Sequence, residues 1–225
     1  MTMHMSKEIS RLKKKLLVLC SQIEDQLWSA VRSIQERDSE LAEKVIEKDL
    51  KIDQDEVDIE EDCLKILALH QPVAIDLRFI VTALKINNDL ERIGDLSVNI
   101  AERSPFLSRQ KPFDIPFDFD LMAEKAQTMV RNGIKALVEM DVDLANEVCA
   151  MDDEVDSINR QMYDLVKQSI LKQPELIESL IHLLSVSRHL ERIGDHATNI
   201  GEDVIYMVKG EIVRHQTETY SSTES

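Results

Sequence analysis

The sequence predicts an all-α protein made of two tandem, pseudo-symmetric three-helix bundles, and three observations predict it. The 225 residues include only five Gly and five Pro, so helix breakers are rare and long helices are possible. Apolar residues recur at three- and four-residue spacing, and no segment alternates convincingly as a strand would. The hexapeptide LERIGD occurs at residues 90–95 and again at residues 190–195.

The repeated hexapeptide belongs to a longer internal duplication. Downstream, Asn-Ile at 99–100 recurs at 199–200, displaced by 100 residues. Upstream, the segment around Asp49 and Asp53 corresponds to the segment around Asp152 and Asp156, displaced by 103 residues. Short loop deletions between shared elements produce a displacement that shrinks in this way, so the chain is a tandem duplication.

Three helices are expected in each half of the chain. They cover residues 6–36, 39–69 and 72–103 in the first half, and residues 120–140, 142–171 and 174–209 in the second. Asp38 or Ser39 is a suitable N-cap for the second helix, and Pro72 opens the third. Gly210 ends the last helix.

The predicted helices define the domain organisation. It comprises a first repeat (1–104), a crossover (105–118), a second repeat (119–213) and a disordered tail (214–225). The segment 104–119 holds three prolines and four of the chain's five phenylalanines, so we expect an ordered connection whose rings pack on the bundles. A patch that docks a partner is the alternative.

Composition excludes several classes of protein. The net charge of −16 argues against nucleic-acid binding, because phosphate contacts need clustered Lys and Arg. Three scattered cysteines without C-x-x-C spacing fit a reducing compartment, and no apolar run is long enough for a signal peptide or a membrane span. We therefore expect a cytoplasmic protein. A basic cluster at residues 7–15 is either a solvated helix turn or a contact with an anionic membrane or acidic partner.

A row of oxygen-bearing side chains follows one face of the third helix in each half. Because each residue advances about 100° around a helix, positions three and four apart share a face. The rows are Glu91, Asp95, Asn99 and Glu102 in the first half, and Glu191, Asp195, Asn199 and Glu202 in the second.

The second helix of each half adds two aspartates. Asp49 and Asp53 interrupt a stripe that otherwise looks directed toward the core, with Ile46 before them and Val57 after them. Carboxylates on such a face need neutralising partners, because an unpaired buried charge is very costly. Asp152 and Asp156 stand at the equivalent place in the second half.

Two kinds of partner could neutralise these carboxylates: Arg92 and Arg192, or bound cations. If neighbouring helices bring the acids together, each half gathers four hard oxygen donors that suit Mg²⁺, Ca²⁺, Mn²⁺ or iron. The alternative is a solvated charged face with pairs inside each helix. The candidate metal ligands are Asp49, Asp53, Glu91, Asp95, Asp152, Asp156, Glu191 and Asp195.

Two glycines lie beside the candidate ligands. Gly94 and Gly194 stand inside helices, where glycine costs about 1 kcal/mol relative to alanine. Something is therefore expected to approach the backbone there, either a ligand or a closely packed helix. His196 has Leu96 as its counterpart, so it belongs to no duplicated site.

No catalytic constellation is found in the sequence. It has no Gly-rich phosphate loop, no nucleophile elbow and no Cys/His pairing suited to nucleophilic catalysis. The Glu-x-x-His spacing of bundle di-iron oxidases is absent from the acidic rows. We therefore do not expect an enzyme.

Together these motifs closely resemble the PhoU family of phosphate-signalling regulators. The resemblance rests on the two LERIGD segments, the paired aspartates and the QPVAIDLR stretch at 71–78, and it covers nearly the whole chain. It implies two similar three-helix bundles and an oligomeric protein, typically a homodimer. It also implies that the eight candidate ligands belong to E(D)xxxD motifs, which hold multinuclear iron or zinc clusters in some members. By donor chemistry, Mg²⁺ and Mn²⁺ are plausible too.

The resemblance further implies a function. Such a protein is a negative regulator of phosphate uptake and of phosphate-starvation signalling. It is similar to an adaptor between the ATP-binding subunit of the phosphate ABC transporter and a membrane sensor histidine kinase, with peripheral membrane association through the basic N-terminal cluster. The alternative is a metal-free helical scaffold that binds basic partner surfaces through its acidic face.

Overall fold

The structure is a computed structural model that describes residues 3–111, 113 and 118–210. Within these ranges the regular elements are all helical. They are α1 (Met3–Gln35), α2 (Ser39–His70), α3 (Ala74–Ala101), α4 (Ser104–Arg109), α5 (Phe119–Glu139), α6 (Val142–Lys172), the 3₁₀ turn η1 (Pro174–Leu176) and α7 (Ile177–Lys209). Within the described residues, no helix combines the length and the hydropathy that a membrane span requires.

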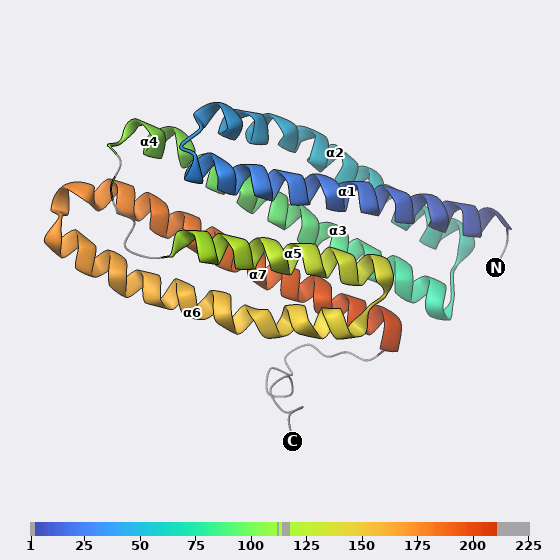
Figure 1. Cartoon of the computed structure of the whole chain (residues 1–225). Coiled ribbons are helices and arrows are strands. Elements are labelled where there is room, and N and C mark those ends of the chain that lie inside the picture. The colour runs from blue at the N-terminus through green and yellow to red at the C-terminus, as the bar shows by residue number, and fades with distance from the viewer. Residues whose placement is uncertain (1–2, 112, 114–117, 211–225) are drawn as a thin grey trace, which may run out of the picture.

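Two three-helix bundles lie side by side with their long axes nearly aligned (Figure 1). One bundle contains α1, α2 and α3, and the other contains α5, α6 and α7. They join mainly where α3 packs against α7, with a smaller contact between α1 and α5. The predicted fold of two tandem three-helix bundles is confirmed.

Equivalent caps begin the second helix of each bundle. The Asp38 carboxylate accepts hydrogen bonds from the backbone amides of Glu40 and Leu41, at 3.0 Å each. Asp141 caps α6 in the same way. Each cap satisfies backbone donors that would otherwise lack partners at a helix start. The duplication therefore extends to the signals that set helix boundaries.

The third helix of the first bundle differs from its predicted bounds. It ends at Ala101, and a short separate helix, α4, follows with Pro105 in its first turn. Proline cannot donate a backbone hydrogen bond but is well suited to the start of a helix, so the chain turns and restarts there. Residues 105–109, expected from the sequence to belong to an ordered crossover between the bundles, are thus helical.

The crossover phenylalanines that lie within the described residues pack on the bundles, as expected. The Phe106 ring stacks on His182 of α7 with 4.1 Å between ring centroids. Phe119 is buried, and Phe113 packs against the core. Phe117 and the tail predicted at 214–225 lie outside the described residues.

One apolar core runs through both bundles. Leu90 and Ile93 of the first LERIGD segment and Leu190 and Ile193 of the second are all fully buried. These leucines and isoleucines fix the rotation of α3 and α7, because their burial turns the intervening acids toward the bundle rims. The hexapeptide therefore builds both core and candidate site.

Candidate metal centres

In the first half, α2 and α3 bring acidic side chains together around Gly94. A Cβ placed on Gly94 would lie 3.7 Å from Asp49 Oδ1. Burial raises the pKa of Asp49, and the nearby charges of Asp53 and Asp95 raise it further. A hydrogen bond of 2.8 Å from Gln26 Nε2 of α1 to Asp49 Oδ1 acts in the opposite direction. These carboxylates thus share one electrostatic environment.

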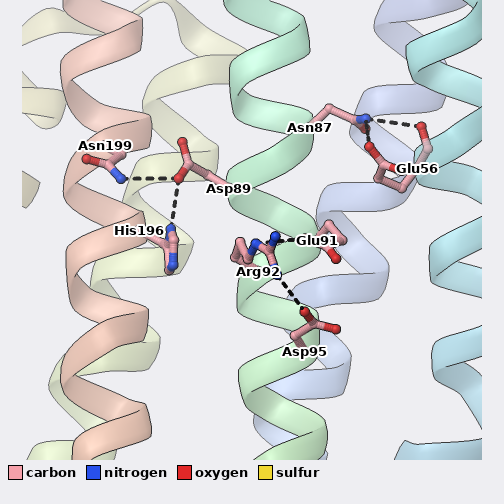
Figure 2. A network of polar contacts seen from close by, with 8 residues as sticks. All are labelled: Glu56, Asn87, Asp89, Glu91, Arg92, Asp95, His196 and Asn199. Carbon is pink, nitrogen blue, oxygen red and sulfur yellow. Dashed lines mark hydrogen bonds and ion pairs between the residues drawn. The ribbon is translucent and has the colours of Figure 1, made fainter.

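Arg92 bridges the two acids that α3 contributes (Figure 2). Its Nε lies 3.3 Å from Glu91 Oε2, and its Nη1 lies 3.2 Å from Asp95 Oδ2. Burial raises the pKa of Glu91, the Asp95 charge adds to the rise, and Arg92 opposes it. The structure therefore shows one predicted neutralising partner in place.

Sequence reasoning missed Glu56, which extends the acidic group along α2. Asn87 Nδ2 of α3 donates to Glu56 Oε1 at 2.7 Å (Figure 2). Burial raises the pKa of Glu56, with further contributions from Glu60 and Asp53. Its position three residues after Asp53, on the same face of the helix, was the available signal.

The second half gathers the equivalent acids between α6 and α7. Asp152 Oδ1 would lie 3.5 Å from a Cβ placed on Gly194. Burial, followed by the charges of Asp195 and Asp156, raises the pKa of Asp152 to about 6. Burial, followed by Glu191 and Asp156, likewise raises the pKa of Asp195 to about 6. All four carboxylates repel one another.

Two clusters can now be defined. The first acidic cluster is Asp49, Asp53, Glu91 and Asp95, and the second acidic cluster is Asp152, Asp156, Glu191 and Asp195. They contain all eight residues proposed from the sequence as metal ligands. In each half the structure brings the pair from the second helix and the pair from the third helix to the same side of the bundle.

The two clusters differ in what neutralises them. Among the described residues, no side chain forms an ion pair with any member of the second acidic cluster. Arg188 and Arg192 lower the pKa of Glu191, and His196 and Arg192 lower the pKa of Asp195, but only from a longer range. The residue equivalent to Gln26 is Met129, whose Sδ would lie 3.6 Å from a Cβ on Gly194. A thioether thus replaces an amide donor.

One feature of the predicted stripe on α2 is wrong. Ile46 and Val57 are 37% and 43% exposed, and Asp53 is exposed as well. The core face of α2 instead carries Val45 and Ile52. The stripe lies on the rim of the helix, where apolar residues keep helical spacing without reaching the core. The acids are therefore accessible from solvent.

Two members of the predicted rows do not extend the clusters. Asn199 Nδ2 faces α3 and donates to Asp89 Oδ1 at 3.2 Å (Figure 2). Glu102 is exposed, and its Oε2 lies 3.8 Å from Arg103. Asn199 therefore does not join Glu191 and Asp195, and Glu102 does not join Glu91 and Asp95.

Gly94 is explained by close packing of α1. A Cβ there would lie 3.1 Å from Ile23 Cδ1 and 3.2 Å from Gln26 Oε1. Around Gly194 the nearest atoms stand at 3.5 Å or more, which is ordinary contact. Of the two explanations predicted, helix packing is seen at Gly94.

The donor set of both clusters fits a hard cation. Carboxylate oxygens are the ligands that Mg²⁺, Ca²⁺ and Mn²⁺ prefer, and a cation would relieve the repulsion that raises these pKa values. Among the described residues, however, no three His, Cys, Asp or Glu side chains are arranged closely enough to hold a metal ion. Metal binding would therefore require the acidic side chains to move closer together.

A polar seam between the bundles was also missed. His196 Nδ1 lies 2.8 Å from Asp89 Oδ1 (Figure 2), and Lys85 Nζ lies 2.9 Å from Asp203 Oδ1, whose side chain is only 2% exposed. Asp89 and Asp203 occur on apolar helix faces, which was the signal that each needed a partner.

Fold and site together define a class of protein: a tandem three-helix-bundle protein with one acidic cluster per repeat. The model of the PhoU domain matches residues 16–104 and 119–204. The chain belongs to the PhoU family.

Relatives and a solved structure match more than nine tenths of the chain. Proteins named phosphate-specific transport system accessory protein PhoU homolog are 38% identical in Aquifex aeolicus and 35% in Clostridium acetobutylicum. The matches cover 95% and 92% of this chain, and 97% and 94% of the relatives. The crystal structure of PhoU from Pseudomonas aeruginosa has a TM-score of 0.88 at 35% identity, covering 92% of this chain and 99% of that one.

A second solved structure is more distant in sequence. The phosphate transport system regulatory protein PhoU from Streptococcus pneumoniae has a TM-score of 0.81 at 27% identity. That match covers 93% of this chain and 99% of the neighbour. The two-bundle architecture therefore persists at low sequence identity.

Proposed function

We propose that this chain is a negative regulator of phosphate uptake and phosphate-starvation signalling whose acidic clusters bind metal cations. In this role it links the ATP-binding subunit of the phosphate ABC transporter to a sensor histidine kinase at the cytoplasmic face of the membrane. It acts as a homodimer and not as an enzyme. The names of its relatives, accessory and regulatory proteins of phosphate transport, support the first part.

The observation that carries the cation-binding part is the convergence of the same four acids in both halves. Burial and mutual repulsion raise the pKa values of Asp49, Glu91, Asp152, Glu191 and Asp195. Carboxylates that are partly buried and lie close to one another are stabilised most by a bound cation. Iron or zinc, as in the resemblance, and Mn²⁺ or Mg²⁺ all fit a set of carboxylate donors.

Metal content tests this assignment. The protein is purified without chelator and without a nickel column, and its metals are measured by plasma mass spectrometry. We expect bound metal in the native chain and a reduced content in the Asp95→Ala/Asp195→Ala variant, with an unchanged circular dichroism spectrum. Equal metal content in both folded proteins would remove the acidic clusters as the site.

The regulatory part is tested separately in cells. Deleting the encoding gene should switch on a phosphate-starvation reporter in phosphate-rich medium, and the native chain should silence it again. A reporter that stays silent after deletion would contradict negative regulation, whatever the metal content.

A second candidate is a metal-free scaffold that binds basic partner surfaces. It is favoured by Arg92, which already occupies Glu91 and Asp95 as a partner's arginine would. Exposed Leu50 and Val57 stand beside the acids on α2 and would add apolar contact. This candidate predicts no metal in the purified protein and partner affinity that falls steeply with salt.

A further inference from the structure

A groove of about 290 Å³ opens between α1 and α2. Its apolar lining includes Leu41, Val45 and Ile52, of which the last two are only 2% and 4% exposed. This volume lies near the lower end of the range for small-molecule sites, about 300 to 1,000 Å³. The groove therefore suits a ligand of modest size with an apolar part.

Three lysines of α2 line the same groove. Lys44, Lys48 and Lys51 are four and three residues apart, so they share one face of the helix. Lys51 is paired with Asp55. In the described part of the chain Lys44 and Lys48 form no ion pair, and both are exposed. A chain with a net charge of −16 thus places two unpaired cations beside an apolar pocket.

The second half provides an internal comparison, because it has the same helices displaced by 103 residues. Its apolar positions are kept, as Leu144, Val148 and Val155. Its lysine positions are not kept: Glu147, Met151 and Glu154 stand there instead. Lys125 of α5 forms an ion pair with Glu154 across the equivalent helices. The basic lining is therefore not required by the fold.

We propose that this groove binds a small organic phosphate of the size of a nucleoside monophosphate. A phosphate monoester carries a charge of about −1.5 to −2 near pH 7, which matches two unpaired lysines better than a single carboxylate would. The carbon frame of the ligand lies on Leu41, the partly exposed apolar residue of the lining. Asp25, on the α1 wall, accepts a hydrogen bond from a ligand hydroxyl or amino group. The proposal rests neither on the acidic clusters nor on the regulatory role.

Calorimetric titration with three probes tests the proposal. AMP carries the phosphate and the apolar part, adenosine lacks the phosphate, and inorganic phosphate lacks the carbon frame. The native protein is first treated with a chelating resin. We expect it to bind AMP, and to bind adenosine and inorganic phosphate at least about tenfold more weakly. No AMP binding, or inorganic phosphate binding as tightly as AMP, would overturn the proposal.

Two charge variants test whether AMP binds in the groove. Lys44→Glu/Lys48→Met introduces the residues of the second half and should weaken AMP binding about tenfold or more. Lys135→Glu/Lys167→Met makes the same charge change on exposed positions of α5 and α6, and should leave AMP affinity within about twofold. Equal weakening by both variants would mean general charge attraction and would overturn the assignment.

A filling substitution tests the cavity without altering charge. Ser29→Phe, on the α1 wall, should abolish AMP binding while the melting curve stays cooperative. If that variant does not fold, Leu41→Phe serves the same purpose from α2. AMP affinity that survives in a folded filling variant contradicts binding in this groove.

Discussion

The two acidic clusters carry equivalent acids on equivalent helices, but the protein neutralises them differently. In the first cluster Arg92 contacts Glu91 and Asp95, and Gln26 donates to Asp49. The second cluster has no ion pair among the described residues, and a methionine replaces the glutamine. Duplication has kept the acids and changed their partners. The second cluster is therefore the one that gains more from a cation.

The largest predicted difference between the halves lies at the seam. Lys85 pairs with the buried Asp203, whereas the equivalent residues, Ser185 and Arg103, make no such pair with each other. Lys85→Met should lower the free energy of unfolding by about 2 kcal/mol, because it removes the ion pair of a buried carboxylate. Urea denaturation measures the change.

The matched control for this prediction is Ser185→Ala, at the equivalent position of α7. It should cost less than about 1 kcal/mol, because it removes only a partly buried hydroxyl contact to His189. Similar losses in Lys85→Met and Ser185→Ala would show that the Lys85–Asp203 pair contributes little.

The next difference is in pH dependence. An aspartate in the unfolded chain has a pKa of about 3.9, whereas Asp152 and Asp195 titrate at about 6 in the fold. Between these pH values the folded state holds more protons, so rising pH lowers the free energy of unfolding of the metal-free protein. Asp152→Asn/Asp195→Asn should remove this loss and add about 1 kcal/mol at pH 7, a value reduced because solvent screens both groups.

The corresponding first-cluster variant sharpens this comparison. Asp49→Asn/Asp95→Asn should stabilise the metal-free protein less, because it leaves Arg92 and Gln26 without carboxylates that they now contact. Thermal melting of both variants between pH 4 and pH 8 measures the difference. A larger gain from the first-cluster variant would reverse the proposed order of the two clusters.

Glycine substitutions probe the packing difference. Gly194→Ala meets only ordinary contacts and should stabilise the fold by up to about 1 kcal/mol through helix propensity. The added methyl group of Gly94→Ala presses on Ile23 and Gln26. This variant should therefore stabilise the fold less than Gly194→Ala does, or destabilise it. Chemical denaturation of the two variants measures the change in the free energy of unfolding. Identical increases in both variants would contradict the closer packing of α1.

The smallest predicted effect concerns Arg92. Its contacts are half exposed, so the pair contributes under about 1 kcal/mol. Arg92→Gln should raise the Mn²⁺ affinity of the first acidic cluster by about threefold, and Arg192→Gln should change the second cluster less. Calorimetric titration resolves this difference. An affinity that falls in Arg92→Gln would mean that the arginine supports the cation site instead of competing with it.

The repeat and the helical periodicity predicted most of the fold and placed all eight acids correctly on their helices. Regularity explains this success, because residues three and four apart share a face wherever a helix forms. Contacts between the halves could not be read in the same way: Asp89 meets His196 only through the packing of α3 against α7. Gln26, which donates to Asp49, comes from α1, and no motif spacing links it to the acids.

One titration tests the central claim, that the acidic clusters bind cations and the second binds first. Chelator-treated native protein is titrated with Mn²⁺ by calorimetry, beside Asp49→Asn/Asp95→Asn and Asp152→Asn/Asp195→Asn. The account predicts a tight site that weakens about tenfold or more in the second-cluster variant and stays within about twofold in the first-cluster variant. Equal weakening in both variants, or no Mn²⁺ binding by the native protein, would contradict it.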